Sequence, residues 1–245
     1  MGLSWLWLAL SVAVGFSVEA ALGFGSALVT VGVGSSFLPL EEILPAFIPL
    51  NLALSTWIVL RHHGHIDRGF LLRRLLPFMA LGLPIGLFAF STLPEAILRR
   101  ILGLFLIALV AIDLLQMLRP SARPRPLPRL AEIALLVLGG AVHGAFGTGG
   151  PMAVYVSKRT LEDKGVFRST LSTLWLILNA LVVAGYAIHG NLSAASGLHS
   201  LALAPGLLLG LIVGQRIHDR VNPETFQRLV LAVLFAAALS AILKG

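Results

Sequence analysis

The sequence predicts an all-α polytopic membrane protein, and its composition, its apolar runs and an internal repeat support this fold class. Of the 245 residues, 57% are hydrophobic and only 12% are charged, and the mean hydropathy is +0.93. Soluble domains carry about 25% charged residues. Eight nearly charge-free runs each approach the ~20 residues that a helix needs to cross the hydrocarbon. These runs cover roughly 3–33, 43–60, 75–94, 101–118, 133–157, 169–188, 197–215 and 229–243.

The composition also excludes several classes of function. Cysteine is absent, which excludes thiol-based electron transfer and iron–sulfur ligation. The net charge of +7 comes from Lys and Arg residues that gather in the loops, where they orient helices and can meet anionic lipid. We therefore expect no nucleic-acid partner, and we expect no cofactor. The first run lacks a basic n-region and a cleavage site, so it should remain in the mature protein.

The second half of the chain repeats the first at an offset of about 124 residues. The matching pairs occur in the same order: GFG at 23–25 with GTG at 147–149, LEE at 40–42 with LED at 161–163, HG at 63–64 with HG at 189–190, GLPIG at 82–86 with GLLLG at 206–210, and PE at 94–95 with PE at 223–224. We predict a first repeat over 1–118, an Arg/Pro-rich linker over 119–130 and a second repeat over 131–245. Internal repeats of this kind are typical of secondary transporters.

The loop charges predict how the two repeats are related. If all eight runs crossed the membrane, the 18 Lys and Arg residues would be divided equally between its two sides. Positive charges normally concentrate in cytoplasmic loops. If the first run of each repeat enters the membrane and returns, 15 of the 18 lie on one side. We therefore predict two inverted repeats, each with a re-entrant or broken glycine-hinged segment plus three transmembrane helices. Both termini would be periplasmic and the linker cytoplasmic.

Each re-entrant segment contains a glycine-rich break that predicts an anion site. The stretch HGAFGTGGP at 143–151 places four glycines and a proline inside an apolar run. Glycine permits the tight turn, and proline suits the first turn of the following half-helix. The free N–H groups at such a helix start bind anions without a charged side chain. The predicted substrate-binding residues are Gly23, Phe24, Gly25 and Ser26 in the first repeat and Gly147, Thr148, Gly149, Gly150 and Pro151 in the second.

Glycines elsewhere in the apolar runs have a simpler interpretation. Glycine is common in membrane helices because it lets neighbouring backbones approach closely. We favour this packing role for the pairs with GxxxG spacing, Gly82 with Gly86 and Gly206 with Gly210. In the two broken segments, the density of glycine and the added proline exceed what packing needs.

At these motifs the sequence resembles the TauE/SafE sulfite exporter family, also called the toluenesulfonate uptake permeases, over nearly its whole length. The resemblance is carried by GAFGTGGP at 144–151, ALGFGS at 21–26, FRSTLSTLW at 167–175 and PGLLLGLIVGQRI at 205–217. It implies a bacterial inner-membrane protein that moves sulfite, organosulfonates or related small anions, commonly outward. The chain departs from the family pattern at Ser26 and Ala27, where members often have further glycines.

Two ionisable residues lie deep within apolar runs, Glu19 and His143. Each precedes its glycine break by four residues, so the repeat makes them counterparts. Charges at membrane depth usually mark substrate or proton pathways, and histidine titrates near physiological pH. We therefore predict that one or both load and release protons coupled to anion movement. The alternative is a static Glu–His pair that holds the two hairpins together.

Several further polar residues are candidates for the substrate pathway. Arg168 follows a cluster of basic residues that sets topology, but its guanidinium suits an oxyanion, so we include it among the substrate-binding residues. Asn51 and Asn179 lie within helices, where they could line a cavity or bond between helices. The histidines of RHHGHIDRG at 61–69 lie in a loop between arginines, and we expect no metal site there.

The sequence thus predicts a secondary transporter of a small sulfur-containing anion, working by alternating access between inverted repeats, and the family resemblance implies an exporter. An anion channel on the same fold is one alternative. An intramembrane hydrolase that uses Ser26 and His143 is another, but the GxSG context of such proteases is missing. We therefore expect no enzyme and no catalytic residues. The predicted partners are a small anion and the lipid bilayer; homo-oligomerisation, direction of transport and coupling ion stay open.

Overall fold

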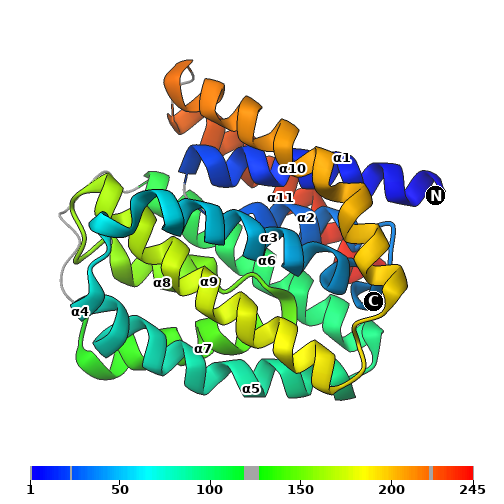
Figure 1. Cartoon of the computed structure of the whole chain (residues 1–245), viewed down its shortest axis with the longest axis horizontal. Coiled ribbons are helices and arrows are strands. Elements are labelled where there is room, and N and C mark those ends of the chain that lie inside the picture. Colours follow the sequence, from blue (N-terminus) through cyan, green and yellow to red (C-terminus); the bar gives the residue numbers. More distant parts are fainter. Residues whose placement is uncertain (1, 23, 119–126, 221–222, 245) are drawn as a thin grey trace. The chain divides into compact units, whose positions relative to one another are not determined.

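All regular structure in the described part of the chain is helical (Figure 1). The computed structural model describes residues 2–22, 24–118, 127–220 and 223–244. Within these residues, six helices are long and apolar enough to cross a membrane, and a shorter apolar helix covers Leu234–Leu243. The six spans are Leu3–Ala20, Leu40–His65, Arg68–Thr92, Arg129–Phe146, Lys164–Ile188 and Ala194–Gly214. The all-α, multi-pass prediction is confirmed.

Two of the eight predicted runs are not among the six spans. The run 101–118 belongs to α6 (Glu95–Leu118), and the run 229–243 belongs to α11 (Pro223–Lys244).

The chain forms two compact units, and each draws on both predicted repeats. Unit 1 comprises Met1–Phe47, Leu93–Pro120 and Ser193–Gly245, and unit 2 comprises Ile48–Thr92 and Ser121–Leu192. The helix α3 (Leu40–His62) begins in unit 1 and ends in unit 2. The division into repeats over 1–118 and 131–245 rests on the sequence match alone and remains a prediction.

Unit 1 is built on α1 (Leu3–Leu22) and α10 (Ala194–Arg220), which lie side by side (Figure 1). A Cβ built on Gly206 would lie 3.1 Å from the carbonyl oxygen of Ala9, and one on Gly210 would lie 2.7 Å from that of Ala13. Because the residue numbers of the contacting positions rise together along the two helices, α1 and α10 run parallel. The packing role predicted for these two glycines is confirmed.

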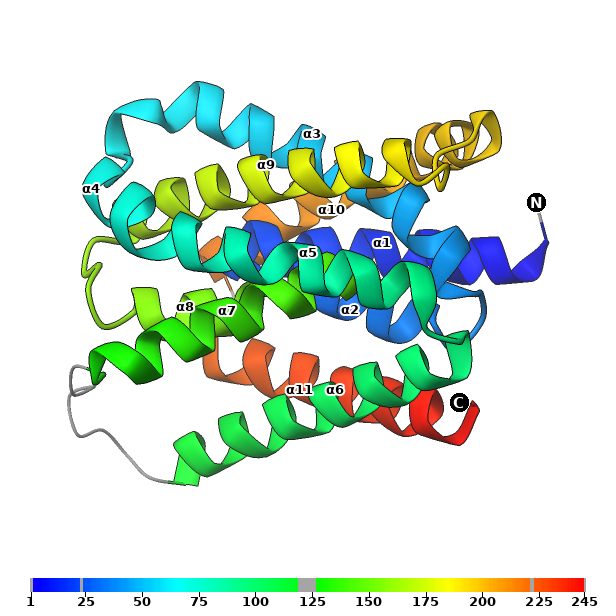
Figure 2. The ribbon, with the colours of Figure 1, turned by 90° about the horizontal axis from the view of Figure 1, so that it is seen from below.

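The other pair of long helices in unit 1, α6 and α11, runs antiparallel (Figure 2). Gly103 packs against Ala238 and Ile242, near the end of α11. Further along α6, Leu106 meets Gly32 of α2 (Ser26–Gly34), and Gly32 also contacts the earlier α11 residue Ala237. The start of α6 therefore lies beside the end of α11.

Unit 2 is built on a second parallel pair, α5 (Leu76–Thr92) and α7 (Arg129–Phe146). Gly82 and Gly86 press against the backbone of α7, where an added Cβ would overlap the carbonyl oxygens of Val137 and Ala141. These contacts confirm the packing role predicted for both glycines. The unit also contains the short elements η1 (His63–His65), α4 (Arg68–Phe70) and the π-helical turn η2 (Leu71–Leu75), and the helices α8 (Gly150–Ser157) and α9 (Lys164–Ile188).

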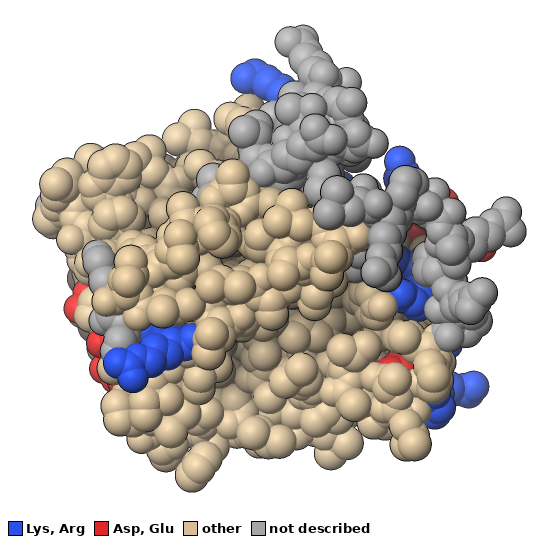
Figure 3. Space-filling view, turned by 180° about the vertical axis from the view of Figure 1, so that it is seen from behind, with Lys and Arg blue, Asp and Glu red and all other residues tan. Residues whose placement is uncertain are grey.

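The surface of the described residues fits a lipid environment. Large apolar side chains are exposed along the helices, among them Leu81 and Phe88 of α5 and Leu201 of α10. Figure 3 shows a face on which most of the visible surface is uncharged, with Lys, Arg, Asp and Glu in small groups. In a bilayer such a face is solvated by acyl chains, and the charged residues remain at the interfaces.

Candidate anion site

The first broken segment is a helical hairpin. Its first arm, α1, ends at Leu22 and its second arm, α2, begins at Ser26, and Gly25 has a φ of 108°. Gly23 lies outside the described residues. The two arms pack against each other: the hydroxyl of Thr30 donates to the carbonyl oxygen of Ser11 at 3.3 Å. Beyond α2, the ring of Phe37 stacks on Trp7 with centroids 5.7 Å apart, so the chain returns to the end at which α1 begins.

The second broken segment repeats this design with α7 and α8. Gly147 ends α7 with a φ of 66°, and its N–H donates to the carbonyl oxygen of His143 at 2.7 Å. The helix α8 begins at Gly150, and Pro151 lies in its first turn. Eight residues of helix span about 12 Å, which is too short to cross ~30 Å of hydrocarbon.

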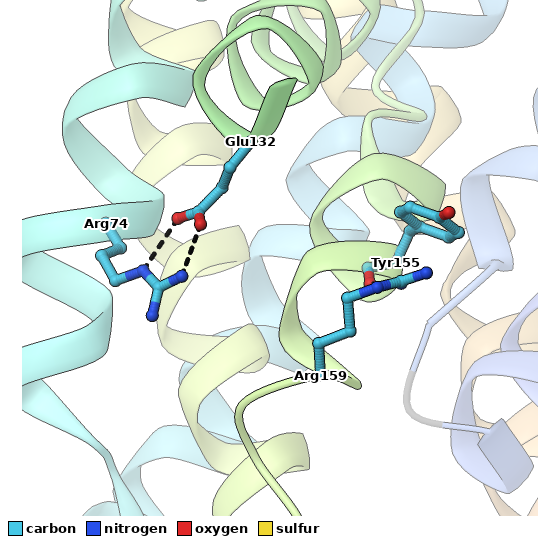
Figure 4. A network of polar contacts seen from close by, with 4 residues as sticks. All are labelled: Arg74, Glu132, Tyr155 and Arg159. Carbon is cyan, nitrogen blue, oxygen red and sulfur yellow. Dashed lines mark hydrogen bonds and ion pairs between the residues drawn. The ribbon is translucent and has the colours of Figure 1, made fainter. Parts of the chain in front are cut away.

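Two contacts show that this second hairpin also returns to its starting end. The backbone N–H of Asp67, which precedes α4, donates to the hydroxyl of Thr170 in the second turn of α9 at 2.9 Å. Nε of Arg74 in η2 donates to Glu132 in the first turn of α7 at 2.8 Å (Figure 4). The loops that follow the second and fifth predicted runs therefore meet at one end of unit 2. That the fifth run enters the membrane and returns remains a prediction, since α7 by itself is long and apolar enough to cross a membrane.

The start of α8 is a half-buried cradle of backbone donors. Its N-cap residue, Gly149, makes no side-chain capping bond, and Pro151 carries no N–H, so Gly150 and Met152 supply the amides of the first turn. Thr148, two residues before Gly150, is 2% exposed, and its hydroxyl has no hydrogen-bond partner among the described residues. A buried hydroxyl without a partner is costly, so the cradle has unmet hydrogen-bonding capacity.

The start of α2 differs, because a side chain already caps it. The carboxylate of Glu19 accepts from the backbone N–H of Ser26 at 3.2 Å and from the hydroxyl of the same residue. Both residues are buried. The positive end of α2 therefore meets a carboxyl group from its own hairpin.

His143, the counterpart of Glu19, points to a different partner. Its Nε2 lies 3.2 Å from Oδ1 of Asn179, and its ring stacks on Trp175 with centroids 5.5 Å apart. The amide of Asn179 donates to Oδ1 of Asn51 at 3.0 Å, and the hydroxyl of Ser55 donates to the same oxygen at 3.4 Å. A buried polar chain thus joins α7, α9 and α3.

These contacts bear on the alternatives that the sequence left open. Asn51 and Asn179 bond to each other between helices, and their role in substrate binding remains a prediction. Glu19 and His143 each have a partner within their own unit. Nδ1 of His143 has no partner among the described residues.

Unit 2 contains several polar atoms without a partner among the described residues, and the sequence analysis singled out only some of the residues that carry them. Arg168, which was predicted, is half-buried, and its Nε has no partner in the described chain. The hydroxyls of Ser157 and Tyr186 share this property. The ion pair of Arg74 with Glu132 was also missed, because each residue by itself resembles an interfacial charge. Within the described residues, no group of three or more His, Asp and Glu residues is placed to hold a metal ion.

Comparison with known proteins identifies the family. The profile described as Sulfite exporter TauE/SafE matches residues 7–241. The chain belongs to the TauE/SafE family. The probable inner membrane transporter protein TsaS of Comamonas testosteroni is 27% identical over 167 residues, which cover 68% of this chain and 69% of that protein. No solved structure matches. Membership of the TauE/SafE family makes the chain a membrane transporter and not an enzyme.

Proposed function

We propose that the chain is a secondary transporter that exports a small sulfur-containing anion, such as sulfite or an organosulfonate, across the bacterial inner membrane. Its TauE/SafE membership supports the substrate class, and its similarity to TsaS, a probable inner membrane transporter, supports the location. The observation that carries the proposal is the start of α8. There, the first-turn amides of α8 have no acceptor within their own helix, and the buried hydroxyl of nearby Thr148 has no partner among the described residues, so this helix start suits an oxyanion.

The cradle suits a transported anion because it holds charge without a cation. Amides and a hydroxyl replace part of the hydration shell of the anion, and the helix dipole favours its negative charge. A Lys or Arg side chain at the same position would bind an oxyanion more strongly, which would slow its release. Asn51, Asn179 and Arg168 complete the proposed pathway within unit 2.

We further propose that the two halves of the chain are inverted repeats that provide alternating access. Under the repeat match, α6 corresponds to α11, and these two helices run antiparallel in unit 1. The parallel pair of α1 with α10 likewise corresponds to the pair of α7 with α5. The antiparallel pair supports an inverted relation, and the repeated parallel pair supports a two-fold one. The charge distribution of the loops supports termini on the periplasmic side.

Proton coupling is proposed to act through Glu19, His143 or both. Each is buried beside a helix break, and each holds a partner that a change of protonation would disturb. Protonated Glu19 would cap α2 less strongly. A proton on both nitrogens of His143 would leave a buried charge beside the start of α8, where it favours an anion.

The test is flux of labelled sulfite, methanesulfonate, sulfate and thiosulfate in proteoliposomes at two pH values. We expect sulfite or the sulfonate to move, with a dependence on the pH gradient and with countertransport of labelled against unlabelled anion. Thr148→Val should lower flux at least tenfold, because it removes the hydroxyl while keeping the volume. Thr173→Val is the matched control, since the hydroxyl of Thr173 donates to the carbonyl oxygen of Ser169 one turn earlier in the same helix.

Two outcomes would contradict the proposal. If none of the four anions moves and none stabilises the protein, the substrate class is wrong. Flux without countertransport would indicate a channel on the same fold.

A further inference from the structure

The two hairpins share the glycine at which their arms approach each other. They differ in the side chain that lies next to the start of the second arm. In the first hairpin, Gly15 lets α2 approach α1, since a Cβ there would lie 2.6 Å from the carbonyl oxygen of Ser26. In the second, Gly139 lets α8 approach α7, since a Cβ there would lie 2.9 Å from the Cβ of Met152. These two glycines are 124 residues apart, which is the offset of the repeat.

In each hairpin, the residue one helical turn after this glycine lies near the start of the second arm. In the first hairpin this residue is Glu19, whose carboxylate binds the N–H and the hydroxyl of Ser26. In the second it is His143, whose Cβ lies close to Gly149 and whose ring turns to α9. The same place in the design thus carries a carboxyl group in one hairpin and an imidazole in the other.

We propose that Glu19 is a built-in anion: its carboxylate occupies at α2 the position that a substrate oxyanion takes at α8. The carboxylate meets the requirements of such a ligand, because it accepts two hydrogen bonds at the positive end of a helix and is 5% exposed. The chain therefore binds one substrate anion, at α8, and not two. The part of this proposal that concerns α8 rests on the proposed function, whereas the part that concerns α2 does not.

The experiment replaces the built-in anion by a soluble one. Glu19→Ala removes the carboxylate, and formate is added to the purified protein as the smallest carboxylate probe. We expect Glu19→Ala to lower the unfolding temperature and formate to restore several degrees of it. Glu19→Gln should not respond to formate, because its amide fills the same volume. Glu42→Ala is the control, since Glu42 is exposed at the start of α3.

Binding stoichiometry tests the same idea independently. Isothermal titration with sulfite should give one site per chain in the wild type and two in Glu19→Ala, because the second cradle then becomes accessible. Two sites in the wild type would overturn the proposal. So would formate that stabilises Glu19→Ala no more than it stabilises Glu42→Ala.

A third measurement keeps the proposal testable if Glu19→Ala does not fold. Infrared difference spectra between the wild type and Glu19→Gln report whether the carboxyl group of Glu19 is ionised at neutral pH. An ionised carboxylate is expected, and a protonated acid would overturn the proposal. Formate rescue in a protein that fails to bind sulfite would refute the proposed function and leave the built-in anion at α2 intact.

Discussion

Replacing Gly86 by alanine tests the packing that holds the second hairpin in unit 2. A Cβ at this position would lie 1.9 Å from the carbonyl oxygen of Ala141 and 2.6 Å from the backbone nitrogen of Ala145. Both atoms belong to the backbone of α7, so no flexible side chain can move aside. Ordinary contact begins at 3.4 Å, so α5 and α7 must separate by about 1.5 Å, which is the difference between 3.4 and 1.9 Å.

The magnitude follows from the cost of overpacking a close-packed interface. Inserting a methyl group where none fits costs about 1–3 kcal/mol, and a clash with backbone belongs at the upper end of that range. For a chain of 150–250 residues, each kcal/mol lowers the unfolding temperature by about 2–4 °C. We therefore expect Gly86→Ala to lower the unfolding temperature by roughly 6–12 °C.

The assay is thermal unfolding in detergent, followed by size-exclusion chromatography. Gly197→Ala is the matched control, because this glycine lies in α10 and nothing lies within 4 Å of a Cβ built there. The control should be neutral or stabilising by up to about 1 kcal/mol, since alanine is the better helix former. Equal unfolding temperatures for the two variants would refute the close approach of α5 and α7.

Three further predictions concern other parts of the account. Glu132→Gln should destabilise unit 2 by about 1–3 kcal/mol, because it leaves the half-exposed Arg74 without its charged, buried partner. A double-mutant cycle with Arg74→Gln should show coupling between the two residues. Additive effects on the free energy of unfolding would contradict the ion pair. Gly147→Ala should cost about 1–2 kcal/mol, because its φ of 66° lies in the left-handed region, and an unfolding temperature equal to that of the wild type would argue against this turn. A reporter fused after Arg125 should read cytoplasmic, as the charge distribution predicts, and a periplasmic signal would reverse the proposed topology.

Much of the helical architecture could be predicted from the sequence because the membrane restricts the choices. Backbone polar groups in hydrocarbon must be paired within a helix, so apolar runs identify the helices. A break in such a run is then informative, and the glycines near positions 25 and 147 do mark the turns of the two hairpins. The returning loops were predicted from charge alone, because Lys and Arg favour one side of the membrane.

The partners of the polar residues could not be predicted in the same way. A helix that is apolar all round gives no periodicity from which its neighbours follow, so the parallel pairing of α5 with α7 is not visible in the sequence. The repeat made Glu19 and His143 counterparts, and this suggested equivalent roles. In the structure, Glu19 bonds to a serine at the start of α2, whereas His143 bonds to an asparagine in α9. Only the tertiary packing decides this difference.

The most direct test of the anion site is the amide spectrum of the first turn of α8. The chain has four methionines, so a spectrum of protein labelled with 15N-methionine is simple, and Met152→Leu assigns the signal of Met152. Titration with sulfite should shift this amide in a saturable manner and leave the other methionines unchanged. A protein that transports sulfite while the amide of Met152 stays still would contradict binding at the start of α8.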